Sequence, residues 1–121
     1  MTGVQSFDFD SPDETRTPDK TRVDVVHIGP STAARLTFQP GWVWAECVKP
    51  VVGTEACQNS HVGYAVSGRL RVRLADGREQ VIRAGDSYTI PPGHDAWVEG
   101  DEPCVAIEVL SAELFGKPAQ G

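Results

Sequence analysis

The fold of this chain is decided by residues 84–93, which read AGDSYTIPPG. The Gly-Asp pair of this segment predicts a turn that opens a short strand at Ser87–Ile90. The Pro-Pro-Gly end forces the chain around a corner, because proline fixes its own φ angle and glycine accepts a positive one. The segment therefore predicts a strand, a corner and the start of a further strand.

The clearest hairpin lies just before this segment. From Arg69 to Leu74 arginine alternates with leucine or valine, and Asp76-Gly77 then supplies a tight turn ahead of Val81 and Ile82. Such alternation is typical of a strand with one buried and one solvated face. The three arginines are therefore interpreted as a solvated strand face and not as an anion site.

The rest of the chain also alternates short β-branched or aromatic runs with turn residues. Further strands are expected at Val23–Ile28, Ala33–Phe38, Trp42–Val48, His61–Ser67, Ser87–Ile90, Ala96–Glu99 and Cys104–Leu110. Only the SAELF segment near the C-terminus has the pattern of a helical turn. The fold class is therefore predicted to be all-β, an antiparallel barrel or sandwich.

Length and composition predict one domain with an N-terminal arm. A chain of 121 residues suits a single core. Residues 1–22 are acidic and poor in apolar side chains, which predicts a flexible arm, with the alternative that Phe7 and Phe9 add an edge strand or cover a partner subunit. Residues 23–115 then form the barrel domain and residues 116–121 a tail.

Charge and cysteine content limit the kinds of partner and the cellular compartment that we expect. The formal net charge of -6 repels nucleic acid and anionic membranes, so neither is an expected partner. The sequence has no apolar run of about 20 residues and no signal-peptide pattern, so we expect a cytoplasmic protein. The 3 cysteines lack the spacing of a disulfide framework, so free thiols are expected.

Two motifs in order resemble the cupin superfamily. Gly85 is followed by five residues and then by Pro91-Pro92-Gly93, which resembles the second cupin signature. Upstream, HVGYAVSG at residues 61–68 looks like the end of the first signature. The resemblance covers roughly residues 41–110 and implies a double-stranded β-helix, a jelly-roll-like barrel that is often a homodimer, with any site inside the barrel mouth.

The metal-binding positions of these signatures are altered. His61 stands where the family has its glutamate, Cys57 lies near the position of the second histidine, and Glu55 near that of the first. In the second signature Ala96 takes the usual histidine position, and a histidine stands at His94 instead. The three-histidine, one-glutamate iron or manganese set of the family is therefore not expected.

The altered set still predicts a candidate metal site. Cys57, His61 and His94 would supply three ligands, with Glu55 or Gln58 as a fourth. Thiolate and imidazole ligands favour Zn²⁺ or copper over iron or manganese. In the alternative interpretation Cys57 is a packed thiol and His94 is a turn residue that holds a backbone carbonyl.

The remaining cysteines and histidine are assigned to the structure. Cys47 and Cys104 have no polar companions and are expected in the core. His27 stands alone on an N-terminal strand and is also interpreted as structural.

The direction of His61 is left open by the pattern of its strand. His61 shares a face with three small residues, Gly63, Ala65 and Ser67, which would leave space for a ligand. The opposite face carries two valines and Tyr64, and periodicity alone would make that the core face. The cupin register favours a cavity-facing His61.

Aromatic residues near these motifs suggest an apolar or aromatic ligand. Trp42 and Trp44 share one face of a predicted strand with Glu46, and Trp97 follows the Pro-Pro-Gly corner. They would line a pocket or a dimer interface, and Tyr64 and Tyr88 would add hydroxyl groups.

Three functions follow, and whether the protein is an enzyme stays open. The first is a small-molecule-binding cupin that acts as a sensor, carrier or accessory protein. The second is a metalloenzyme that uses the Cys57, His61 and His94 set on a small organic substrate. The third is metal-free catalysis with His61 or His94 as general base, oriented by Glu46 or Glu55.

Overall fold

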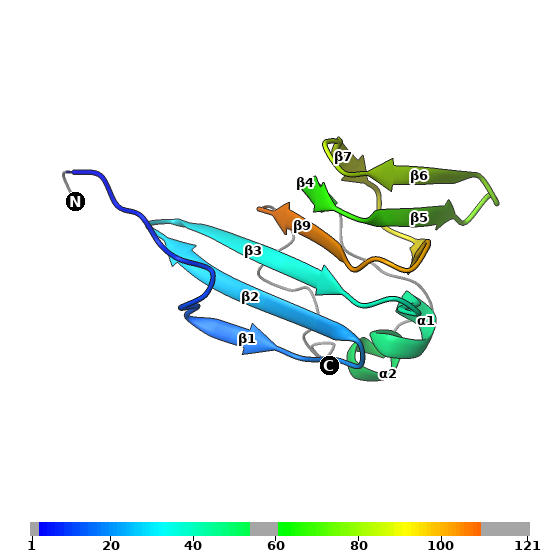
Figure 1. The fold of residues 1–121 in the computed structure, drawn as a ribbon, viewed down its shortest axis with the longest axis horizontal. Coiled ribbons are helices and arrows are strands. Elements are labelled where there is room, and N and C mark those ends of the chain that lie inside the picture. Colours follow the sequence, from blue (N-terminus) through cyan, green and yellow to red (C-terminus); the bar gives the residue numbers. More distant parts are fainter. Residues whose placement is uncertain (1–2, 54–60, 110–121) are drawn as a thin grey trace.

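The computed structural model describes residues 3–53 and 61–109 of the chain, and these residues form two packed antiparallel sheets (Figure 1). The elements in chain order are β1 (Glu14–Arg16), β2 (Thr21–Ile28), β3 (Ser31–Phe38), α1 (Trp44–Cys47), α2 (Lys49–Val52), β4 (His61–Ser67), β5 (Arg69–Leu74), β6 (Glu79–Arg83), β7 (Ser87–Ile90), β8 (His94–Val98) and β9 (Cys104–Glu108). The larger sheet has the order β1-β2-β3-β9-β4-β7, and the smaller sheet has the order β6-β5-β8.

The hydrophobic core lies between the two sheets. Alternation along β5 buries Leu70 and Val72, and these pack with residues of the larger sheet such as Val25 and Leu36. The arginines of β5 lie on the opposite, outer face, as predicted. The prediction of an all-β, jelly-roll-like barrel is therefore confirmed.

The predicted strands are largely those of the structure. Strands β4 and β7 begin and end at the predicted residues. Strand β8 starts at His94, two residues before the predicted Ala96, and its burial alternates from that first residue. His94 therefore lies on the same buried face as Ala96.

The strand predicted at Trp42–Val48 is wrong, because this segment forms α1 and leads into α2. Proline in the first turn suits the start of α2, and Gly53 ends that helix with a φ of 80°. The buried residues of α1 and its end are Trp44, Cys47 and Val48, which follow the i, i+3, i+4 spacing of a helix. No helix in the described part of the chain is long and apolar enough to cross a membrane.

Part of the predicted flexible arm is an edge strand. Glu14–Arg16 forms β1 and pairs antiparallel with β2, with Glu14 opposite Val25. The arm therefore does add an edge strand, but not at Phe7 and Phe9 as the alternative proposed. The Arg16 side chain is buried and bonds Glu14 at 2.7 Å.

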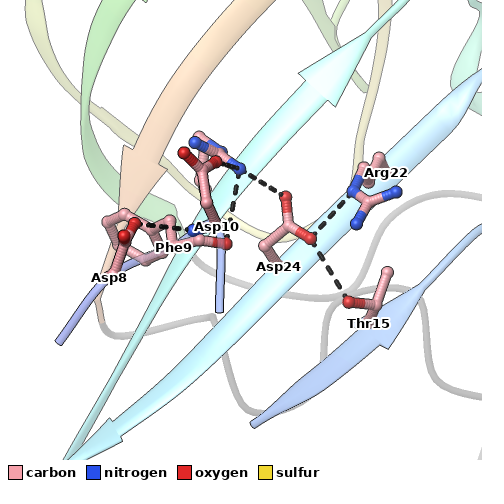
Figure 2. Close-up of polar contacts among 7 residues, drawn as sticks. Asp8, Phe9, Asp10, Thr15, Arg22 and Asp24 are labelled. Carbon is pink, nitrogen blue, oxygen red and sulfur yellow. Dashed lines mark hydrogen bonds and ion pairs between the residues drawn. The ribbon is translucent and has the colours of Figure 1, made fainter. Parts of the chain in front are cut away.

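A buried carboxylate joins the strands at this edge (Figure 2). Asp24 of β2 is fully buried, and its oxygens accept hydrogen bonds from Arg22 Nε at 2.9 Å, Arg35 Nη2 at 3.1 Å and Thr15 Oγ1 at 3.3 Å. The donors belong to β1, β2 and β3. A buried carboxylate is tolerated when cations and hydrogen bonds compensate its lost hydration, and this one has both.

The arm before β1 is bound to the same cluster. Arg35 also pairs with Asp10 at 2.9 Å, donates to the Phe9 carbonyl oxygen at 3.4 Å and lies 5.8 Å from the centre of the Phe9 ring. The arm therefore follows the outer face of the larger sheet (Figure 2).

We expect the substitution Asp24→Asn to lower the free energy of unfolding by about 1–3 kcal/mol. The amide keeps the shape but loses the charge that faces two guanidinium groups. Urea denaturation would measure the change. The matched control is Asp10→Asn, whose side chain is 76% exposed, and it should change stability by less than about 0.5 kcal/mol. Equal effects of the two variants would contradict the interpretation.

Candidate functional site

The candidate site is a cavity between the two sheets with a mostly apolar lining. Its apolar wall includes Leu36, Phe38, Leu70, Ile82 and Ile90. The space open to the centres of water molecules is about 20 Å³, which is enough for a group of about the size of one water. Six side chains with nitrogen or oxygen atoms share this lining: Trp42, Trp44, His61, Tyr88, His94 and Glu108.

His61 lies on the inner face of β4. His61 and Ala65 are buried, whereas Tyr64 and Val66 are 48% and 50% exposed. The direction favoured by the cupin register is therefore confirmed, and the alternative in which Tyr64 belongs to the core face is wrong. Tyr64 also cannot be a cavity residue as predicted, because it points to the outside of the larger sheet.

The centre of the site is a carboxylate that accepts two hydrogen bonds. Glu108 of β9 receives the Nδ1–H of His61 on Oε1 at 2.7 Å and the hydroxyl of Tyr88 on Oε2 at 2.5 Å. The side chains of His61 and Glu108 are both only 4% exposed. Three adjacent strands, β7, β4 and β9, therefore contribute one group each to a continuous hydrogen-bonded chain.

The space beside His61 is occupied by the side chains of Tyr88 and Glu108. Gly63 lies opposite both Tyr88 and Glu108 in the strand register. A Cβ atom at Gly63 would lie 2.8 Å from both the Tyr88 hydroxyl oxygen and the Glu108 Cγ. This is closer than Cβ atoms approach non-bonded atoms in proteins. The small residue thus makes room for two polar side chains from neighbouring strands.

His94 enters the cavity from the smaller sheet. Its Nδ1 lies 2.7 Å from the Pro91 carbonyl oxygen, which can only accept, so Nδ1 carries a proton and, in the neutral tautomer, Nε2 has the lone pair. Its ring is centred 5.0 Å from that of His61, at an angle of 70°. His94 is thus both the turn residue that holds a backbone carbonyl and a buried cavity residue, two roles treated as alternatives above.

Burial sets the protonation of two further groups. Burial first, and then the nearby charge of Glu108, raise the pKa of Tyr88 well above its usual value, so the phenol remains a hydrogen-bond donor at neutral pH. Burial raises the pKa of the Cys104 thiol to about 11. Cys104 is therefore a neutral wall residue at neutral pH and not a thiolate, and both Cys47 and Cys104 are buried free thiols, as expected.

The structure places the predicted aromatic residues in different environments. Trp42 and Trp44 line the cavity, although they come from α1 and the turn before it and not from a strand. Glu46 is exposed, so its predicted place beside them is wrong. Trp97 packs under the guanidinium of Arg73, 5.5 Å from its ring centre, on the other face of β8 from His94.

The described residues do not complete a metal site. Cys57, Glu55 and Gln58 lie outside the described residues, so their predicted role as ligands stays a prediction. Among residues 3–53 and 61–109, no three histidine, cysteine or acidic side chains are grouped to hold a metal ion. Within the described part of the chain, His61 and His94 offer two imidazoles to the cavity.

Glu108 is the site residue that the sequence analysis missed. Its signal is the alternation in CVAIE, where Cys104, Ala106 and Glu108 are buried. A carboxylate on the buried face of an apolar strand requires a polar partner. This requirement would have identified Glu108 as a candidate site residue. The exposed His27, which bonds Thr32 Oγ1 at 3.2 Å, lies apart from the site as expected.

In general chemical terms, the site can position a proton donor or acceptor. A histidine whose Nδ1–H is held by a carboxylate presents Nε2 as the proton-accepting nitrogen, which is the usual arrangement of a general base. The same orientation is found in histidines that bind metal through Nε2.

Comparisons with known proteins agree with this architecture. The family model described as Cupin domain matches residues 49–110. The structure is similar to a Cupin 2 conserved barrel domain protein from Salinispora arenicola, with a TM-score of 0.58, 19% identity, and coverage of 90% of this chain and 87% of that chain. No curated protein sequence matches significantly.

Two further solved structures are similar in fold. The polyketide cyclase RemF from Streptomyces resistomycificus has a TM-score of 0.63 and 16% identity over 88% of this chain and 78% of that chain. KdgF from Halomonas sp. has a TM-score of 0.60 and 18% identity over 89% of this chain and 92% of that chain. At such identities the likeness is one of fold.

The raised pKa of Tyr88 gives a test of this geometry. In a Tyr64→Phe variant Tyr88 is the only tyrosine left. We expect that the folded variant shows no tyrosinate absorbance as the pH passes about 10, the ordinary tyrosine value. Because the folded-state pKa is raised, the stability contributed by the protonated phenol is full below about pH 10 and is lost as the pH rises further.

Urea denaturation at pH values on both sides of about 10 would measure this loss. A Tyr64→Phe, Tyr88→Phe double variant is the control, because its stability should lack this contribution to the pH dependence. Tyrosinate absorbance near pH 10 in the still folded single variant would show that Tyr88 is not buried beside Glu108.

Proposed function

Because this chain belongs to the cupin domain family and its buried polar groups meet at one cavity, we propose that it binds a small organic molecule whose polar group enters that cavity. The observation that carries the proposal is the buried chain His61–Glu108–Tyr88. In this role the protein acts as a sensor, carrier or accessory protein.

The energetics of the core support a binding role. A carboxylate and two imidazoles at 3% exposure each make the core less stable than apolar residues of the same volume would. Polar groups that converge in an otherwise apolar cavity are the usual composition of a ligand site. Recognition of a ligand would explain why the protein keeps these polar groups although they lower its stability.

The size and lining of the cavity define the expected ligand. About 20 Å³ accommodates a small polar group but not a whole ring. The body of the ligand would therefore lie toward the barrel mouth, against apolar and aromatic side chains such as Trp42.

The first test is binding by calorimetry, with small oxygen-bearing aromatic and alicyclic compounds as probes. We expect Tyr88→Phe to weaken binding about 5- to 10-fold, because the loss of the hydroxyl removes a hydrogen bond that holds Glu108 in place. Tyr64→Phe is the matched control, because the same change is made outside the cavity, and it should leave affinity unchanged. Equal affinities of the two variants would place the ligand elsewhere.

A metal site is the second candidate, and one observation favours it. The Nδ1 atoms of His61 and His94 are both held by oxygen atoms, Glu108 Oε1 and the Pro91 carbonyl, so each ring directs Nε2 as its coordinating nitrogen. Cys57 would be the third ligand. Such a set would suit Zn²⁺ or copper, which would act on a small organic substrate.

Elemental analysis of protein purified without a metal-affinity step tests this candidate. If it holds, the native protein carries stoichiometric metal, and His61→Ala, His94→Ala and Cys57→Ala each lose most of it. His27→Ala is the control, because this histidine is exposed and should not affect metal content. Unchanged metal content in the three site variants would rule the metal candidate out.

A further inference from the structure

The indole of Trp44 carries a buried hydrogen-bond donor that lacks an acceptor. Trp44 is 2% exposed and lines the cavity, and its Nε1–H has no hydrogen-bond partner among the described residues. Trp42 lies two residues earlier, lines the same cavity and is equally buried, but its Nε1–H donates to Thr21 Oγ1 at 2.8 Å. Of these two similar donors, only the Trp44 donor is left unsatisfied.

No acceptor of the described residues bonds the Trp44 Nε1–H, and the carboxylate and carbonyl oxygens of the site already accept other hydrogen bonds. Each oxygen of Glu108 accepts a hydrogen bond, one from His61 and one from Tyr88, and the Pro91 carbonyl oxygen is bonded to His94. Buried N–H groups are nearly always paired in folded proteins. An unpaired one on a residue that lines a cavity therefore indicates an acceptor that the described residues do not supply.

The charge of a group and its number of hydrogen-bond donors select the kind of acceptor. A carboxylate or phosphate would bring negative charge to the cavity that already contains the Glu108 carboxylate, which is unfavourable. A hydroxyl would bring a proton that itself needs an acceptor, and an imidazole Nε2 atom would have to supply it. A neutral carbonyl oxygen accepts without a proton or charge.

We propose that the ligand of this site carries a neutral carbonyl group, whose oxygen accepts the hydrogen bond of Trp44 Nε1–H. Trp44 is then a specificity-determining residue that distinguishes a carbonyl compound from a hydrocarbon of the same shape. The inference rests on the proposed function, because it names the class of molecule that the cavity binds.

The experiment compares two pairs of probes of the same shape with the full-length protein. Cyclohexanone is paired with methylenecyclohexane, and acetophenone with α-methylstyrene, so that C=CH₂ replaces C=O. The indole N–H signals in nitrogen-proton NMR spectra report on each of the 3 tryptophans and are assigned from single Trp→Phe variants. Ligand-detected NMR gives the affinities.

We expect the ketones to shift the Trp44 indole signal, to leave the Trp97 signal in place and to bind at least about tenfold more tightly than their methylene analogues. Trp44→Phe should remove this preference while keeping the affinity for the hydrocarbons. Trp97→Phe is the control, because this tryptophan lies on the other face of β8 from His94 and does not line the cavity, and it should keep the preference for ketones.

The outcomes separate the two proposals. If ketones and hydrocarbons bind equally and the Trp44 signal does not move, this inference is overturned while ligand binding in the cavity stands. If neither kind of probe binds, the inference falls together with the proposed function. Ketone preference that survives in Trp44→Phe would overturn the role of Trp44 even where the ligand class is right.

Discussion

The interaction on which the site depends is the double hydrogen bond to the Glu108 carboxylate. It joins β9 to β4 through His61 and to β7 through Tyr88, so three neighbouring strands of the larger sheet are connected inside the core. Because the carboxylate accepts from both sides, it fixes the proton on Nδ1 of His61 and the direction of the Tyr88 hydroxyl. The polarity of the cavity follows from this one group.

The described part of the chain has two buried carboxylates, and their partners differ in kind. Asp24 is paired with two guanidinium groups, which stay charged at any pH of interest, so its cluster holds strands and arm together as a fixed ion-pair network (Figure 2). Glu108 is paired instead with an imidazole and a phenol, groups that can gain or lose a proton. Of the two, Glu108 lines the cavity and Asp24 does not.

Much of the fold was predictable because strands such as β5, β8 and β9 alternate between buried and more exposed residues. The alternation in β5 and the turn residues around β7 define faces and ends locally, without knowledge of distant partners. The segment Trp42–Val48 was not predictable in this way. Its tryptophans and valines are typical strand residues, but tertiary packing of Trp44, Cys47 and Val48 selects a helix.

The site was predictable only where a motif supplied the register. His61 and His94 were identified because the glycines and prolines near them align with a known pattern. Glu108 stands 47 residues from His61, and their contact depends on the pairing of β9 with β4, which no local pattern reveals. Trp44 was predicted as a ligand-binding residue, but its unpaired donor could be recognised only from the positions of all acceptors around it.

Gly63 shows how a residue without a functional group can belong to a site. In the sheet it lies between Tyr88 on β7 and Glu108 on β9, and the hydrogen bond between these two residues crosses its strand. Residues on alternate strands are separated by about twice the usual strand spacing, roughly 9–10 Å, so two long side chains meet only above a position with no side chain. The glycine is therefore the geometric condition for the Glu108–Tyr88 bond, and thereby for the fixed polarity of the cavity.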